Sequence, residues 1–321
     1  MRFEDVVLEH RACPLGCAPD DEPVVVGRDR LHDLPGEFQV VRCRACGLMR
    51  TDPRPTPETM GFYYPEEYGP YQDTRVEISN GPRSPLSAWK RSLTERLNSF
   101  TLGDHVPALE PGRMMEFGCA SGLFLHRMAA GGWKVEGIEF AEKAAEAARS
   151  LGYRVHAGAL EDAPDPEERY DLVVGWMVLE HLHEPVKALR KLHSWTRPGG
   201  WLAVSTPNVG AREFTLFKDA WLALHLPNHL YHYTPETLSR VLDSGGWQVR
   251  EIFHQRQLSN LLASFGYVLK DRRSLPALSE KLIRFPDRGG KLHYFLYPVS
   301  YLFSLLGQTG RITVWAQRKD D

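Results

Sequence analysis

The 321-residue sequence has no excess of charge of either sign, because 39 lysines and arginines are balanced by 41 aspartates and glutamates. A large nucleic-acid surface usually needs a basic face, so this balance argues against one. The sequence also has no apolar run of the roughly 18 residues that a membrane span needs. Its first ten residues contain no signal-peptide core, and no repeat or low-complexity segment stands out. We therefore expect a cytoplasmic protein without a transmembrane segment.

Cysteine is scarce, and four of the five cysteines form two close pairs, Cys13/Cys17 and Cys43/Cys46. In a reducing compartment such pairs indicate a metal site rather than disulfides. Two thiolates across a tight turn reach one tetrahedral ion, and Gly47 lets the backbone turn beneath it. The spacing predicts one structural zinc ion held by the four cysteines, with no open position for water. Four unrelated thiols or a redox pair are the alternatives.

The composition divides the chain into five segments. Short β-rich runs separate the cysteine pairs, as in a zinc ribbon, and prolines interleaved with tyrosines follow as a stiff, loop-like linker. Ser84-Pro85 provides the N-cap and first residue of a helix through about Phe100. Alternating strand and helix patterns then predict a parallel, doubly wound α/β sheet. The predicted segments are a zinc ribbon at 1–52, a linker at 53–84, an α/β core at 85–253, a helical insertion at 254–310 and the last strand of the core sheet at 311–321.

The predicted insertion carries three apolar runs of helical character. Residues 258–270 and 278–285 read as amphipathic helices, and 292–306 is apolar but interrupted by Pro298. The last run is too short to span a bilayer. We expect a helical lid or a homodimer face. Contact with a membrane surface is the alternative, although few basic residues flank this run.

Residues 114–122 read Met-Met-Glu-Phe-Gly-Cys-Ala-Ser-Gly, which is the most informative stretch of the chain. An apolar strand ends in Glu116, a tight turn carries Gly118 and Gly122, and an apolar-periodic helix follows. Glycines let a ligand approach the backbone, and the first turn of a helix offers free N–H groups. The stretch therefore predicts a ligand site at the carboxyl end of a strand.

A second strand, residues 135–139, ends in Glu139 about 20 residues after the turn. An acid in this place suits the ribose diol of a nucleotide in a βαβ unit. The turn is not Gly-x-Gly-x-x-Gly, so a dinucleotide is the weaker reading. Glu-x-Gly-x-x-x-Gly resembles the first motif of class I S-adenosylmethionine (SAM) methyltransferases.

Three further segments resemble the same family in the same order. Residues 170–176 look like its fourth strand, Glu180-His181-Leu182 follows, and 192–207 look like its helix, Pro-Gly-Gly turn and fifth strand. The resemblance implies a Rossmann-like sheet whose glycine turn holds the amino-acid end of SAM and whose second acid holds the ribose. The SAM-binding residues that it implies are Glu116, Gly118, Cys119, Ala120, Gly122, Glu139, Phe140, Leu160, Gly175 and Trp176.

Methyl transfer from SAM needs a base on the acceptor side, and histidine suits neutral pH. One candidate is His181, after the fourth strand; capping of the helix that begins near Glu184 is its alternative role. The other candidates lie in residues 223–234, before the next helix: His225, His229 and His232. Their spacing would suit a metal on one helix face, but Pro227 indicates a loop. His183 and His193 read as surface positions.

A zinc ribbon, a tyrosine-rich linker, Glu-His after strand four and a histidine loop together resemble the nucleotide-sugar C-methyltransferases and related methyltransferases of glycan and natural-product clusters. The resemblance implies that His229 is the base. The acid and the phenol of that family's loop fall on Asn228 and Leu226, so carbon methylation stays open. The second α/β domain of the sugar enzymes has no room here, and quinone-pathway O-methyltransferases similarly carry Glu-His after strand four.

These features predict a SAM-dependent methyltransferase that acts on the oxygen or carbon of a sugar or another small hydroxylated metabolite. Two alternatives remain open. One is an rRNA or tRNA methyltransferase with a zinc ribbon, which the near-neutral charge disfavours. The other is a non-catalytic SAM-binding scaffold that uses the ribbon and the C-terminal helices as docking surfaces.

Overall fold

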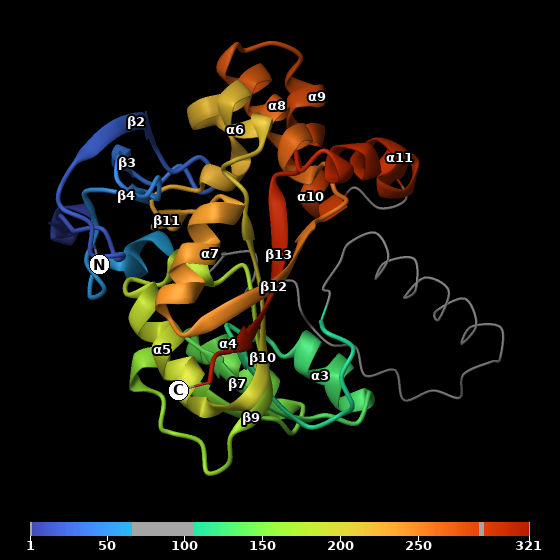
Figure 1. Ribbon diagram of the computed structural model, residues 1–321. Helices are drawn as coiled ribbons and strands as arrows, with labels where there is room; N and C mark the ends of the chain where they lie inside the picture. The colour runs from blue at the N-terminus through green and yellow to red at the C-terminus, as the bar shows by residue number, and fades with distance from the viewer. Residues whose placement is uncertain (1, 66–105, 289–291, 321) are drawn as a thin grey trace.

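The computed structural model describes residues 2–65, 106–288 and 292–320, which form a large β-sheet, a small β-sheet and a two-stranded sheet (Figure 1). The large sheet has seven strands in the order β12-β13-β10-β9-β6-β7-β8. Neighbours from β10 to β8 are parallel, whereas β13 runs antiparallel to both β10 and β12. The strands are β6 Arg113–Phe117, β7 Lys134–Glu139, β8 Arg154–Ala157, β9 Tyr170–Trp176, β10 Thr196–Pro207, β12 Trp247–His254 and β13 Arg311–Arg318.

This order confirms the predicted Rossmann-like class I methyltransferase fold, including the antiparallel pair β12–β13 at one side of the sheet. The central strands are apolar runs without alternation, as expected where helices cover both faces. Leu172, Val173 and Val174 of β9, for example, are all completely buried. β6 and β9 are neighbours although β7 and β8 lie between them in sequence. A doubly wound sheet binds ligands at such a switch point, outside the carboxyl ends of its strands.

Among the described core helices, only α7 begins at a side-chain cap. Thr234 caps α7 by accepting from the Thr237 backbone N–H, and Thr237 reciprocates toward the Thr234 N–H. α3 and α4 pack on β7, while α5 and α7 lie side by side near β10 and β12. The core helices are α3 Leu123–Ala130, α4 Glu142–Ser150, α5 Pro185–Trp195, α6 Arg212–Phe217 and α7 Pro235–Ser244, with short 3-10 helices η3 Leu160–Asp162, η4 Leu179–His181, η5 Lys218–Ala220 and η6 Leu222–Leu224.

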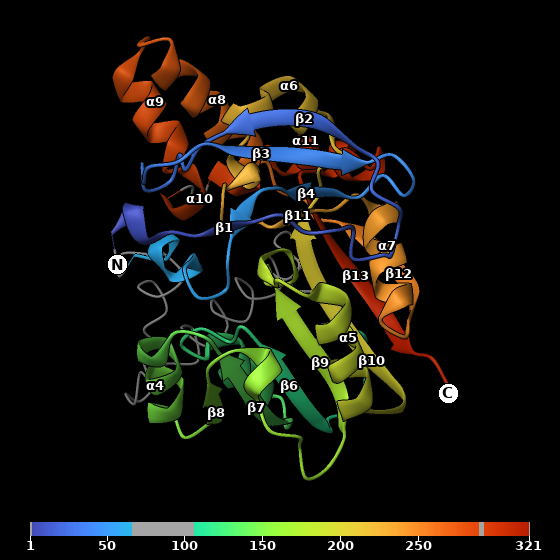
Figure 2. The same ribbon diagram turned by 90° about the vertical axis from the view of Figure 1, so that its left-hand side faces the viewer.

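The small sheet has the order β11-β4-β3-β2, and Figure 2 shows it lying across the core near the arrowhead of β9. Three of its strands are N-terminal, but β11 comes from the histidine loop of the core. The predicted ribbon is therefore joined to the core by backbone pairing. Its elements are η1 Phe3–Asp5, β1 Leu8–Glu9, β2 Asp21–Gly27, β3 Phe38–Cys43, β4 Met49–Thr51 and, from the core, β11 Tyr231–His232.

The first part of the predicted linker, residues 53–65, has more structure than a loop. β5 (Arg54–Pro55) pairs with β1, and η2 (Met60–Tyr63) packs its tyrosine against Phe38 of β3. Proline is tolerated in β5 because this sheet has only two strands, both of them edges. Residues 66–84 and the predicted helix over 84–100 lie outside the described residues.

In the part of the predicted helical insertion that the structure describes, four helices lie between β12 and β13: α8 Ser259–Asp271, α9 Pro276–Ile283, α10 Phe285–Arg288 and α11 Leu292–Leu305. Pro298 lies inside α11 instead of ending it. Phe295 and Leu302 of α11 are 80% and 55% exposed, and the lid or dimer face remains a prediction. Among the described helices, none is long and apolar enough to cross a membrane.

Candidate functional site

A cavity of about 1210 Å³ lies where the core, the N-terminal segment and the helical insertion meet. Its walls include the turn after β6, the loop before β11 and side chains of α8 and α9. Ligand sites of about 300–1,000 Å³ are usual, so this cavity has room for two small molecules side by side. We describe it as a cofactor half, lined by the β6 and β7 ends, and an acceptor half, lined by the histidines.

The cofactor half collects most of the residues predicted to bind SAM. The eight that line the cavity are Glu116, Gly118, Cys119, Ala120, Glu139, Phe140, Leu160 and Trp176. Gly122 and Gly175 are not among the lining residues. A Cβ on Gly122 would lie 2.9 Å from Cβ of Ala148 in α4, and one on Gly175 would lie 2.1 Å from the Phe117 ring. Both glycines therefore permit close packing behind the cavity wall.

Gly118 is the glycine on which the shape of the turn depends. Its φ of +72° lies in the left-handed region, and a Cβ there would come within 2.3 Å of Val178. The backbone N–H groups of Gly118 and Cys119 both donate to the carbonyl of Ile138, at 2.8 and 3.1 Å. These bonds fix the turn to the neighbouring strand β7.

The two acids of the cofactor half are buried, Glu116 at 3% and Glu139 at 5% exposure. Glu139 accepts the backbone N–H groups of Ala120 and Ala141, each at 2.8 Å, which fixes its carboxylate at the cavity wall. Burial raises the pKa of Glu139. A carboxylate has about four lone-pair sites, so these backbone bonds leave acceptor capacity for a ligand. Two acids beside a glycine turn fit a ligand that is cationic and carries hydroxyl groups, as SAM does.

The acceptor half contains three neighbouring histidine rings, which approach one another from two loops. The ring centroid of His229 lies 4.7 Å from that of His181 and 4.8 Å from that of His225. His229 Nδ1 lies 2.9 Å from the carbonyl oxygen of Ala223. A carbonyl only accepts, so Nδ1 carries the proton and Nε2 presents a lone pair. The loop conformation expected from Pro227 is confirmed, because no helix spans residues 225–230.

Glu180 is a site residue that the sequence prediction did not single out. Its carboxylate is completely buried, has no hydrogen bond, and lies 3.9 Å from Nε2 of His229. Burial raises the pKa of Glu180 to about 8 and lowers that of His229 well below its usual value. Both groups are therefore neutral at pH 7, and the contact is not an ion pair. The available signal was a charged residue shortly after the buried strand β9 and directly before a candidate histidine.

His181 does not cap a helix, which was its alternative role. Its Nδ1 lies 2.8 Å from the hydroxyl of Tyr64, a tyrosine of the predicted linker. α5 begins after Glu184, where no side chain caps the backbone. His181 also hydrogen-bonds the backbone of Asn228, and burial lowers its pKa to about 4. The ring links the linker, the fourth strand and the histidine loop.

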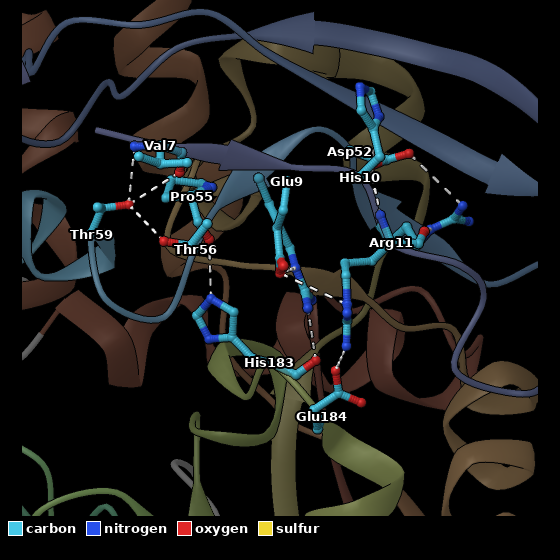
Figure 3. Close-up of polar contacts among 12 residues, drawn as sticks. Val7, Glu9, His10, Arg11, Asp52, Pro55, Thr56, Thr59, His183 and Glu184 are labelled. Carbon is cyan, nitrogen blue, oxygen red and sulfur yellow. Dashed lines mark hydrogen bonds and ion pairs between the residues drawn. The ribbon is translucent and has the colours of Figure 1, made fainter. Parts of the chain in front are cut away.

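His183 and His193 are partly buried, so their prediction as surface positions was wrong. His183 Nε2 contacts the carbonyl of Pro55 at 3.1 Å, and the His193 ring contacts the carbonyl of Lys319 at 3.2 Å. Figure 3 shows His183 and Glu184 below the N-terminal segment, with Glu184 paired to Arg11. The β5 pairing folds the linker onto this loop, which no local pattern reveals.

The four predicted zinc ligands come together. The Sγ atoms of Cys13 and Cys46 are 3.5 Å apart, and all four sulfur atoms lie within 4.8 Å of one another. A tetrahedral zinc with bonds of about 2.3 Å separates its sulfurs by about 3.8 Å, so the cluster fits zinc. Glu180, His181 and His229 also lie close enough to suggest a metal. The ring of His181 is already engaged by Tyr64 and Asn228, which argues against that second site.

A methyltransferase-domain family matches residues 90–252 of the chain. The ubiquinone biosynthesis O-methyltransferase of Bordetella pertussis is 32% identical over 128 residues, or 37% of this chain and 53% of that protein. The enzyme of the same name from Xanthomonas axonopodis pv. citri is 30% identical over 191 residues, or 54% of this chain and 76% of that protein. The chain thus spans about half the length of the first relative.

Among solved structures, a SAM-dependent methyltransferase from Mesorhizobium loti aligns with 66% of this chain and 94% of its own, at 18% identity and a TM-score of 0.43. That similarity is too low to carry an argument. The family match covers about half of the 321 residues and includes the glycine turn, Glu139 and the Glu180-His181 pair. The chain therefore belongs to the methyltransferase-domain family and has the class I, SAM-dependent methyltransferase fold.

Proposed function

We propose that this methyltransferase transfers the methyl group of SAM to a hydroxyl oxygen of a small metabolite. The observation that carries the proposal is the shared cavity, in which two buried acids lie in one half and the lone pair of His229 Nε2 in the other. The similarity to ubiquinone biosynthesis O-methyltransferases also supports oxygen as the acceptor atom.

SAM supplies an activated methyl group on a sulfonium. Glu139 and the turn at Gly118 would hold the ribose and the amino-acid end, in keeping with their place in the cofactor half. His229 would take the hydroxyl proton on Nε2 while the acceptor oxygen forms its bond to the methyl carbon. The electrons of the broken carbon–sulfur bond stay on sulfur, so the products are a methyl ether, a neutral thioether and a protonated imidazole.

Glu180 would assist this proton transfer. A protonated imidazole is costly in a buried site unless polar groups lie nearby to stabilise it. An oxygen of the neutral Glu180 carboxyl group, 3.9 Å away, would face the new charge, while Glu180 keeps its own proton. His181 and the Tyr64 hydroxyl would complete the acceptor side, with His181 as the alternative base.

The walls of the acceptor half favour an acceptor with apolar surface. They include Leu31, Trp221, Leu224 and Tyr267, from three separate parts of the fold. Asn228, which stands where the sugar C-methyltransferases have an acid, is completely buried and donates to the Tyr63 carbonyl at 2.8 Å. It anchors the loop, and this supports O-methylation over C-methylation.

The test is incubation of the protein with methyl-labelled SAM and separate pools of phenols and catechols, nucleotide sugars, and RNA. We expect label in a hydroxylated small molecule, and its methyl ether identifies oxygen as the acceptor atom. Label in RNA alone would support the zinc-ribbon RNA methyltransferase instead. SAM binding without turnover on any pool or on cell extract would support the scaffold alternative.

A further inference from the structure

The histidine loop is held by the cysteine-bearing hairpin. β4 pairs antiparallel with β11, so that Arg50 lies opposite Tyr231 and Met49 opposite His232. The backbone N–H of Thr51 extends this pairing by donating to the carbonyl of Leu230 at 3.0 Å. The loop that carries His229 therefore belongs to the core and also supplies an edge strand, β11, of the ribbon sheet.

Thr51 lies at the centre of this contact and is only 1% exposed. Its hydroxyl oxygen is 2.7 Å from the carbonyl oxygen of His229 and 3.2 Å from Nε2 of His232. Because a carbonyl only accepts, the hydroxyl proton goes to His229, and the Thr51 oxygen accepts from the N–H of His232. One buried side chain thus satisfies two groups of the loop.

The same hairpin carries two of the four clustered cysteines. Cys43 ends β3, its N–H donates to the Leu48 carbonyl, and its carbonyl accepts from Gly47. Leu48 is followed directly by β4, so only four residues separate Cys46 from Thr51. A metal ion on the cysteines would close the turn from which β4 emerges. Through its hydrogen bond to the His229 carbonyl, Thr51 connects this turn to His229.

We propose that Thr51 is a positioning residue for His229, and that the four-cysteine cluster sets the position of Thr51. His229 is fixed at two places, its ring by the Ala223 carbonyl and its own carbonyl by Thr51. Losing the second constraint lets the ring shift within the cavity. A displacement of about 1 Å can cost on the order of 100-fold in rate. The catalytic consequence rests on the proposed function, whereas the structural coupling does not.

The experiment compares Thr51→Val, Thr51→Ser and Thr59→Val in the full chain. Valine keeps the shape of threonine without the hydroxyl, and serine keeps the hydroxyl. Thr59 is the matched control, because it is a buried threonine of the N-terminal segment whose hydroxyl bonds Val7 and Thr56 instead of the loop. Hydrogen exchange of peptides covering 225–233, SAM affinity and turnover are measured for each.

We expect Thr51→Val to raise exchange across 225–233 and to lower kcat by about ten- to 100-fold, with unchanged SAM affinity. Thr51→Ser should show the exchange across 225–233 and the kcat of the wild type, and Thr59→Val should change neither of these two quantities. Extraction of metal from the wild type with a chelator should raise exchange in the same peptides but not across 114–122. If Thr51→Val does not fold, this metal extraction alone tests the coupling between the cysteine cluster and the histidine loop.

Unchanged exchange across 225–233 in Thr51→Val, or raised exchange with normal kcat, would overturn the positioning role. A loss of activity that Thr51→Ser does not restore would also overturn it. Failure of the proposed function has a different signature, namely a fully active His229→Ala variant. That result leaves the exchange pattern of Thr51→Val unaltered, so the two failures are distinguishable.

Discussion

Oε1 of Glu180 lies 3.9 Å from Nε2 of His229, and neither residue is more than 4% exposed. No hydrogen bond reaches the carboxylate. Burial favours the uncharged form of both groups, so the acid keeps its proton and the imidazole lacks one at neutral pH. This places a proton donor next to the lone pair that we propose as the base, in the interior of the protein.

The burial of Glu180 predicts a stability that falls as pH rises. Its pKa is about 8 in the folded chain, against an ordinary value of 4.5. Between these values the folded state holds one more proton than the unfolded state, so the free energy of unfolding decreases with pH. Below about pH 4.5 the contribution is fully present, and above about pH 8 it is lost. The size is on the order of 5 kcal/mol.

Glu180→Gln removes this dependence, because glutamine stays neutral at every pH. We expect urea unfolding at pH 5 and pH 8.5 to show a smaller loss of stability in the variant than in the wild type. Glu146→Gln, at an exposed position of α4, is the control and should follow the wild type. Parallel pH profiles of wild type and Glu180→Gln would contradict the prediction.

The sequence predicted the core because its signals are local. The turn at Gly118 and the strand-end acid Glu139 lie within one βαβ unit, the apolar strand β9 follows after β8, and each element carries its own periodicity. Most of the predicted SAM residues line the cavity for this reason. Gly122 and Gly175 do not, because a glycine needed for close packing and one needed for ligand approach look the same in a sequence.

The acceptor side was less predictable because its contacts join distant segments. Tyr64 meets His181 across 117 residues, and Thr51 meets His229 across 178. Nothing in the local pattern at 49–51 indicates that β4 pairs with β11. Glu180 was recognised only as part of the Glu-His motif and was given no role, because only the tertiary fold shows that it is buried without a hydrogen bond.

The turn of the cofactor half can be tested with two glycines of similar conformation. Gly118 and Gly152 have φ values of +72° and +91°, so alanine strains the backbone at both. Only at Gly118 would the new Cβ collide, with Val178 at 2.3 Å, whereas nothing lies within 4 Å at Gly152. We expect Gly118→Ala to weaken SAM binding by more than about tenfold in calorimetry, which corresponds to 1.4 kcal/mol. Gly152→Ala should bind normally, and equal affinities would refute the role of Gly118.

Glu139→Ala tests the ribose contact at the same site. The carboxylate holds the N–H groups of Ala120 and Ala141 as well as facing the cavity. Loss of a charge-assisted bond typically costs about 1.5–3 kcal/mol, so SAM affinity should fall roughly 10- to 100-fold. Calorimetry measures the SAM affinity of each variant. Glu139→Gln keeps the shape of the side chain without its charge, so it shows which of the two SAM binding requires. Unchanged affinity in Glu139→Ala would remove this residue from the SAM site.

The cysteine cluster predicts about one zinc ion per chain in metal analysis of the purified protein. Cys43→Ser should lose the metal and unfold the ribbon sheet, because metal binding there contributes directly to folding. Cys119→Ser is the matched control, since Cys119 is also a buried free thiol but lies outside the cluster. Metal-free wild type that remains fully folded would defeat this prediction.

The base is tested by His229→Ala and His181→Ala, once an acceptor is known. Removal of a general base commonly lowers the rate by about 100- to 10,000-fold. We expect His229→Ala to lose turnover in this range and to keep its SAM affinity, because His229 lies in the acceptor half. His181→Ala should cost less, since its ring is already engaged by the Tyr64 hydroxyl and the Asn228 backbone.

His232→Gln is the control for these variants. This histidine is as buried as His229, but its Nε2 contacts Thr51 and it does not line the cavity. Since the amide nitrogen of glutamine can take the place of imidazole Nε2 and still donate toward Thr51, the variant should keep most of the activity. If His181→Ala abolishes turnover while His229→Ala retains it, the base is His181. If neither variant is impaired, then methyl transfer depends on positioning of the acceptor alone.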